Sequence, residues 1–130
     1  MDRNRIKDLQ FIYKYSEYSI FCAEVMDAFD FLTPFIINTS FNKDVWYYAA
    51  TFHLKQNIQL KFVFDDEGFK RNQLFIKKGI SQWKPLYSDN QFQHKEGMVN
   101  LHEILLFYRM KLKPFFANTI QYKQLVKSSN

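Results

Sequence analysis

Residues 45–78 alternate apolar and polar side chains, and this alternation constrains the fold more than any other feature of the sequence. The apolar side chains of two consecutive runs share one parity: Trp46, Tyr48, Ala50, Phe52 and Leu54, then Ile58, Leu60, Phe62 and Phe64. A period of two residues is typical of a strand with one buried side and one exposed side. The segment therefore predicts an antiparallel meander with one apolar face and one face that is available to a partner.

Short polar segments divide this meander into strands. We expect turns at residues 55–56 and 66–68, the second with a glycine that supplies the positive φ of a short hairpin loop. A weaker strand over residues 35–41 precedes the alternating run. Residues 80–87 could add a short edge strand before Pro85, because proline is tolerated at an edge and not in a central strand.

A helical pattern precedes the meander. Residues 3–14 have apolar side chains at helical spacing, and a stronger pattern follows Ser16. We expect Pro34 to end this second helix, because proline disfavours the helical conformation of the residue that precedes it. The buried side of the second helix is predicted to consist of Phe21, Val25, Ala28, Phe29 and Leu32.

Two more helices are predicted after the meander. Asn100 and Glu103 have the spacing of a helix-capping pair, and Pro114 suits the first turn of a last helix that runs to about Val126. The order of helices, meander and helices lacks the βαβ alternation of a parallel sheet. The sequence therefore predicts a single α+β domain over residues 1–130, with an N-terminal helix or helices, a four- to five-stranded antiparallel meander and C-terminal helices packed on one face.

Composition narrows the compartment and the class of protein. The chain has one cysteine, Cys22, and its opening ten residues lack the apolar stretch of a secretory signal. No apolar run approaches the roughly 18 residues that a membrane span needs. We therefore expect a cytoplasmic protein that does not enter a membrane. The three glycines leave no room for a glycine-rich phosphate-binding loop.

The net charge of +5 is divided unevenly along the sequence, which indicates charge-guided association with a partner. Acidic residues gather on one side of the predicted N-terminal helix and at the second hairpin turn, and the candidates for partner binding among them are Glu24, Asp27, Asp30, Asp65, Asp66 and Glu67. Basic residues gather in two later segments, and the candidates there are Lys70, Arg71, Lys77, Lys78, Arg109, Lys111 and Lys113.

No pattern in the sequence predicts a catalytic, cofactor or metal site. His53, His94 and His102 are scattered, and a zinc site would need three or four clustered ligands. We expect the carboxylates of residues 65–67 to form a solvated acidic turn, because the spacing of a calcium-binding loop is absent. We therefore expect no enzyme. An enzyme would require a concave pocket in which histidines and carboxylates converge.

Nucleic acid is the first alternative partner. Lys61 and the basic residues of the following strand lie in sequence near Tyr47 and Phe75, a combination that could join phosphate contact to base stacking. The basic C-terminal helix could add to such a surface. In the other interpretation, the lysines protect sheet edges and keep a very aromatic chain soluble.

Two stretches carry a resemblance to known proteins. The run LKFVFDDEGFKRNQLFIKKG (residues 60–79), followed by NLHEILLFYRMKL (residues 100–112), resembles the sheet-then-helix half of small bacterial immunity and antitoxin proteins that are encoded beside secreted toxins. The resemblance implies an inhibitor that masks a cognate toxin or effector and performs no reaction. A basic target would meet the acidic candidates, and an acidic target would meet the basic ones. A subunit of a larger complex is the second alternative.

Overall fold

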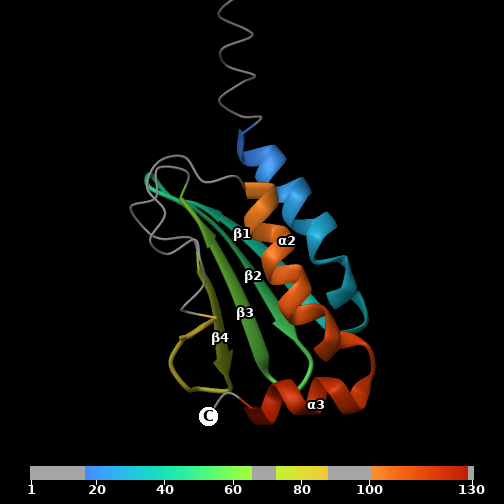
Figure 1. The fold of residues 1–130 in the computed structure, drawn as a ribbon. Coiled ribbons are helices and arrows are strands. Elements are labelled where there is room, and N and C mark those ends of the chain that lie inside the picture. Colours follow the sequence, from blue (N-terminus) through green and yellow to red (C-terminus); the bar gives the residue numbers. More distant parts are fainter. Residues whose placement is uncertain (1–16, 66–72, 88–100, 129–130) are drawn as a thin grey trace, which may run out of the picture.

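The computed structural model describes residues 17–65, 73–87 and 101–128 of the chain. These residues form an α+β fold in which an antiparallel sheet carries helices on one face (Figure 1). Several predicted features lie outside the described residues: the helix over residues 3–14, the turn at 66–68, the cap residue Asn100, and the candidates Asp66, Glu67, Lys70 and Arg71.

Five strands follow one another across the sheet in the order of the sequence, and each is antiparallel to the next. The strands are β1 (Ile36–Lys43), β2 (Tyr48–Leu54), β3 (Ile58–Phe64), β4 (Gln73–Lys78) and β5 (Lys84–Leu86). This order confirms the predicted meander. The edge strand was predicted to come before Pro85, but Pro85 lies inside β5. An edge strand tolerates it because an edge position does not need the N–H that proline lacks.

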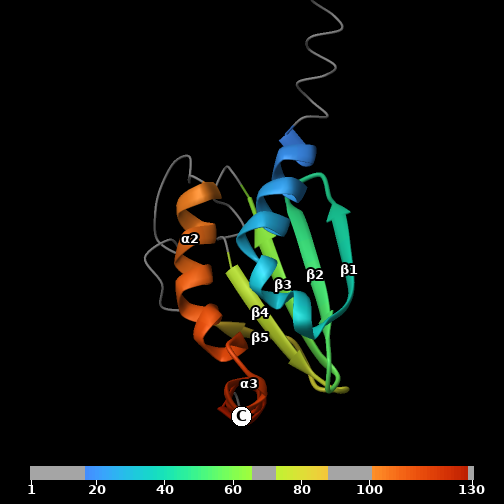
Figure 2. The ribbon, with the colours of Figure 1, turned by 90° about the vertical axis from the view of Figure 1, so that its right-hand side faces the viewer.

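Helices cover one face of the sheet, as the view in Figure 2 shows. The N-terminal helix is described over residues 17–28 and passes into a 3₁₀ helix, η1 (Asp30–Phe35). The prediction that Pro34 ends the α-helix was wrong, because the α-helix ends at residue 28 and Pro34 lies within η1. The 3₁₀ turn already appears where the Leu32 N–H donates to the Phe29 carbonyl at 3.0 Å.

The C-terminal part contains α2 (Leu101–Leu112), the 3₁₀ helix η2 (Lys113–Phe116) and α3 (Thr119–Ser128). Pro114 lies in η2, so the prediction that it begins the last helix was wrong. Asn118 takes that role instead. Its side-chain oxygen accepts from the Gln121 N–H at 2.9 Å, which is the usual arrangement at the N-terminus of a helix.

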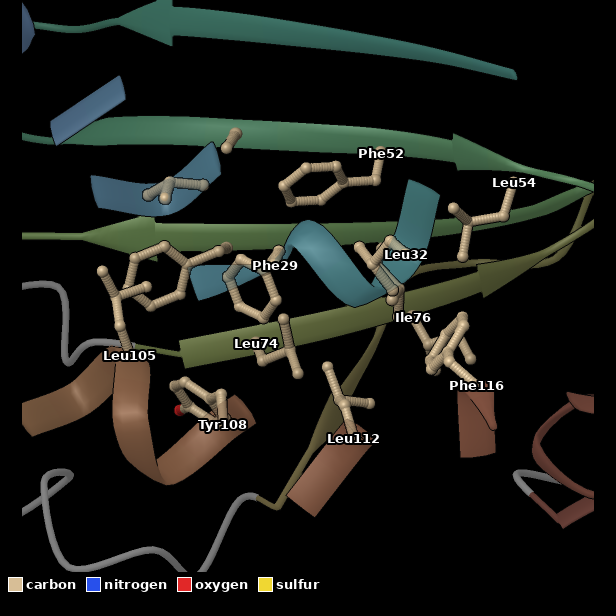
Figure 3. Packing of buried hydrophobic residues seen from close by; sticks show 14 of the residues in the cluster. Phe29, Leu32, Phe52, Leu54, Leu74, Ile76, Leu105, Tyr108, Leu112 and Phe116 are labelled. Carbon is tan, nitrogen blue, oxygen red and sulfur yellow. The ribbon is translucent and has the colours of Figure 1, made fainter. Parts of the chain in front are cut away.

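The core lies between the sheet and the helices (Figure 3). One face of β2, β3 and β4 is buried, as the alternation predicts: Ala50, Phe52, Leu54, Ile58, Leu60, Phe62, Phe64, Leu74 and Ile76. Trp46 departs from the pattern and is 63% exposed, because β2 begins at Tyr48 and Trp46 lies in the preceding turn. The helices bury Phe21, Val25, Phe29, Leu32, Ile104, Leu105, Tyr108, Leu112, Tyr122 and Leu125 against this face.

Tyr122 connects α3 to the sheet. Its hydroxyl donates to the carbonyl of Lys55 in the β2–β3 turn, and its ring stacks on Phe35 with the centroids 4.3 Å apart. Burial raises the pKa of Tyr122 to about 12. At the other end of the helix, the Lys78 ammonium donates to the Val126 carbonyl. These contacts fix α3 beside the ends of β2, β3 and β4.

The Phe62 ring contacts aromatic rings from both helical segments that cover the sheet. We expect Phe62→Ala to lower the free energy of unfolding by about 3–5 kcal/mol, because the side chain is fully buried and leaves a cavity. Val63→Ala, one residue further along the same strand on the opposite face, should cost only about 1 kcal/mol. Urea denaturation at neutral pH measures both. Equal costs would mean that the helix-covered face is not the core.

Tyr122→Phe should lower the free energy of unfolding by about 1–2 kcal/mol at neutral pH, because the Lys55 carbonyl loses its donor. Since the folded-state pKa of Tyr122 is raised to about 12, the stabilisation is complete below pH 10 and is lost as the pH rises through 12. The gap in stability between the native chain and the variant should therefore narrow above pH 10. A gap that stays constant in urea titrations across this range would contradict the assignment.

Candidate functional site

A groove of about 200 Å³ runs between the N-terminal helix and α2 and opens to solvent. Acidic, basic and apolar side chains line it together: Glu24, Asp27, Ala28, Asp30, His102, Leu105, Leu106 and Arg109. Four of these residues were sequence candidates, three from the acidic set and Arg109 from the basic set. The structure therefore brings the two alternative sets to one place.

Arg109 holds the two helices together at this groove. One of its guanidinium nitrogens (Nη1) lies 2.8 Å from the Asp30 carboxylate and 2.7 Å from the Ala28 carbonyl. The Ala28 carbonyl belongs to the last turn of the N-terminal helix, where carbonyls lack helical partners and a cation is favourable. The hydrogen bond from Arg109 also lowers the pKa of Asp30. Asp30 and Arg109 are therefore paired with each other, and the two were not expected to meet.

The groove continues into a more apolar hollow of about 490 Å³ along the outer side of α2. Its lining shares Leu106 and Arg109 with the first hollow and adds Met110, Lys113, Pro114 and Ala117. Met110 is 75% exposed and Leu106 is 45% exposed. We call the two hollows together the helical groove, which joins acids at one end to Lys113 at the other across an apolar middle.

Sequence analysis missed Leu106 and Met110. A signal for them existed, because they lie four residues apart and fall outside the buried stripe of α2, which consists of Ile104, Leu105, Tyr108 and Leu112. Large apolar side chains together on the exposed side of an amphipathic helix mark a possible contact surface.

His102 and three carboxylates share the helical groove, which meets the first geometric requirement of an acid–base site. Arg109 forms an ion pair with Asp30 and lowers the pKa of its carboxyl group. This carboxylate is therefore a weak base near neutral pH. The described residues that line the groove include no serine, threonine, cysteine or lysine close to His102 in the acidic half. Among the residues that line this half of the groove, His102 therefore has no side-chain nucleophile beside it.

Three other candidates have positions that the sequence did not predict. Asp65 is buried, with 2% of its surface exposed, so the expectation of a solvated acidic residue was wrong at this position. Lys78 points to the helix-covered face and binds the Val126 carbonyl, which gives it a structural role. Lys111 lies on the exposed side of α2, with its ammonium 5.7 Å from the centre of the Phe107 ring.

The face of the sheet opposite the described helices carries a second group of candidate side chains. The Lys61 ammonium lies 4.4 Å from the centre of the Trp83 ring and 5.6 Å from that of Phe75. The Lys77 ammonium approaches the same indole at 5.9 Å. Burial, and then the charge of Lys77, lowers the pKa of Lys61. We call these four residues the lysine–aromatic cluster, of which Trp83 was missed by sequence analysis.

A hollow of about 290 Å³ adjoins this cluster on the same face. Its described lining combines small, aromatic and hydrogen-bonding side chains: Asn42, Tyr47, Ala49, Thr51, Lys61, Val63 and Phe75. The lining contains no carboxylate. The two faces of the molecule therefore differ in chemistry, since the helical groove contains both signs of charge.

Over residues 17–65, 73–87 and 101–128, no three histidine, cysteine or acidic side chains are placed to hold a metal ion. None of the helices in these ranges has both the length and the apolar character needed to cross a membrane.

Comparison of the chain with known protein families, with curated proteins and with solved structures finds no match. The resemblance to immunity and antitoxin proteins therefore stays a prediction.

Arg109→Met removes the guanidinium and keeps most of the side-chain stem. We expect it to lower the free energy of unfolding by about 1–2 kcal/mol, because the Ala28 carbonyl and the Asp30 carboxylate both lose a donor. Asp30→Asn should have a smaller effect, since Arg109 keeps its carbonyl contact. The ion pair of Asp30 adds to the free energy of unfolding at pH values above the unfolded-state pKa of aspartate, about 3.9. This stabilisation disappears as the pH falls through the lowered pKa of Asp30 in the folded state.

Urea denaturation at neutral pH and below pH 4 separates these effects. If Arg109→Met and Asp30→Asn lower the free energy of unfolding equally at neutral pH, the hydrogen bond from Arg109 to the Ala28 carbonyl contributes nothing.

Proposed function

We propose that this chain is a non-catalytic protein-binding domain of the immunity type, which inhibits a cognate toxin or effector by covering part of its surface. The observation that supports this most is the helical groove, where the exposed side chains of Leu106 and Met110 lie between charged groups of both signs. Protein interfaces have this composition, with an apolar centre and a polar rim. Methionine suits such a centre because its flexible thioether adapts to the partner.

The order of charges along the helical groove describes the complementary partner. Glu24 and Asp27 lie at one end, the apolar middle follows, and Lys113 lies at the other end. A partner segment with a basic end, an apolar middle and an acidic end would match this order. Such complementarity raises the association rate and fixes the register of docking.

Nucleic acid fits the helical groove less well. A phosphate backbone that followed the groove would approach the carboxylates of Glu24 and Asp27, and like charges at close range oppose binding. A subunit of a larger complex would use the same groove in the same way, so that alternative differs in the identity of the partner and not in the surface. The proposal places the domain in the bacterial cytoplasm, where its cysteine, Cys22, stays reduced.

Capture from the native cell, followed by a variant pair, tests the proposal. The tagged full chain should recover one protein in a stoichiometric complex, and the purified partner should be inhibited when the chain is added. Met110→Asp should weaken the complex at least tenfold, or about 1.4 kcal/mol, because it places a charge in the apolar middle. Ile80→Asp makes the same kind of change at a fully exposed apolar residue after β4 and should leave the affinity unchanged.

Isothermal titration calorimetry measures these affinities. The assignment of the groove fails if Met110→Asp and Ile80→Asp bind the partner equally well. The inhibitor role fails if the captured partner keeps its full activity in the complex. Turnover by the chain alone that is lost in His102→Ala would favour the enzyme alternative, because His102 lies beside carboxylates in this groove.

A further inference from the structure

We propose that the sheet face opposite the described helices is a second binding site, which takes single-stranded nucleic acid. In this arrangement Lys61 and Lys77 hold a phosphate, and the hollow beside Phe75 receives a base. The site lies on the other side of the molecule from the helical groove, so it goes beyond the protein-binding role and does not depend on it.

Two ammonium groups converge on one indole ring in the lysine–aromatic cluster. Lys61 and Lys77 both lie within 6 Å of the centre of the Trp83 ring, at 4.4 Å and 5.9 Å. The electron-rich ring face attracts each cation, but the two cations repel each other. The effect is visible at Lys61, whose pKa is lowered by burial and by the charge of Lys77. An anion between the two ammonium groups would remove this repulsion and favour the charged form of both.

No aspartate or glutamate occupies an outward position in the described strands β1 to β4, where these lysines lie. The pairing register assigns the outward positions of β1 to β4, and none is aspartate or glutamate. Those positions are Asn38, Ser40, Asn42, Ala49, Thr51, His53, Gln59, Lys61, Val63, Gln73, Phe75 and Lys77. The ligand that complements this face is therefore anionic.

The hollow favours a nucleotide over an acidic peptide. Its volume of about 290 Å³ is lined by the aromatic rings of Tyr47 and Phe75 and by the small side chains of Ala49 and Val63, and a base can stack on such rings. Asn42 and Thr51 add hydrogen-bonding groups at its wall. A carboxylate peptide would engage the lysines but would have no ring for the hollow. A single strand offers both a phosphate and an unstacked base, whereas a duplex keeps its bases paired.

Fluorescence anisotropy with the full chain tests this site. The probes are labelled oligouridine and oligothymidine strands of about 12 nucleotides, which also separate RNA from DNA. Lys61→Gln and Lys77→Gln should each weaken binding roughly fivefold or more, and Phe75→Leu should weaken it without changing the charge. With one phosphate held, log K should fall with log salt at a slope of roughly −0.7, so that the affinity drops about 2.6-fold between about 50 and 200 mM salt.

Matched controls come from the helical groove. Lys113→Gln removes the same charge from the other side of the molecule, and Met110→Asp disrupts the proposed protein site, so neither should change oligonucleotide affinity. Circular dichroism and the melting temperature establish that each variant is folded, and Lys77→Gln remains informative if the half-buried Lys61 proves necessary for folding.

Three results would overturn the proposal. The first is no binding of either strand at 50 mM salt. The second is an equal loss of affinity in Lys113→Gln and Lys61→Gln, because it would indicate attraction by net charge alone. The third is competition by oligoglutamate with the same dependence on Lys61, which would assign the face to an acidic peptide. Each result leaves the Met110→Asp test of the helical groove unaffected.

Discussion

The burial of a single sheet face under the helices determines the remaining structure, and the ring of Phe62 lies at its centre. Its centroid is 6.1 Å from those of Phe21 and Phe29, and 5.8 Å from that of Tyr108 in α2. Because one ring contacts side chains from both helical segments, neither segment can shift without disturbing the packing of the other. This packing brings Arg109 to within 2.8 Å of Asp30, which lies 79 residues earlier in the chain, and so creates the helical groove.

The alternation of buried and exposed side chains made the sheet predictable from the sequence. The ends of the helices were less predictable. Ile58 to Phe64 alternate in burial as expected, because a strand offers only two faces and the core takes one of them. Pro34 and Pro114 were expected to mark the boundaries of α-helices, but both lie within 3₁₀ turns, which also tolerate a missing N–H. The true start of α3 follows Asn118, a residue whose capping role could have been recognised from the sequence.

The candidate sites were less predictable, because sorting residues by sign of charge ignores which groups meet in space. Asp30 and Arg109 were assigned to opposite sets and form an ion pair. Lys77 and Lys78 were grouped together, although their alternation already implies opposite faces: Lys77 lies on the face of Lys61, and Lys78 on the face of Ile76. Trp83 was beyond reach, since its approach to Lys61 depends on how the short edge strand β5 pairs with β4.

The net charge of +5 describes neither of the two proposed surfaces. The helical groove contains both acids and bases in its lining, whereas the outward positions of β1 to β4 contain only basic and neutral side chains. A helix is about 10 Å thick, which exceeds the Debye length of about 8 Å at physiological ionic strength. A partner at one face is therefore largely screened from the charges of the other. Each surface can select its own partner, one through mixed charge around Met110 and the other through the paired ammonium groups at Trp83.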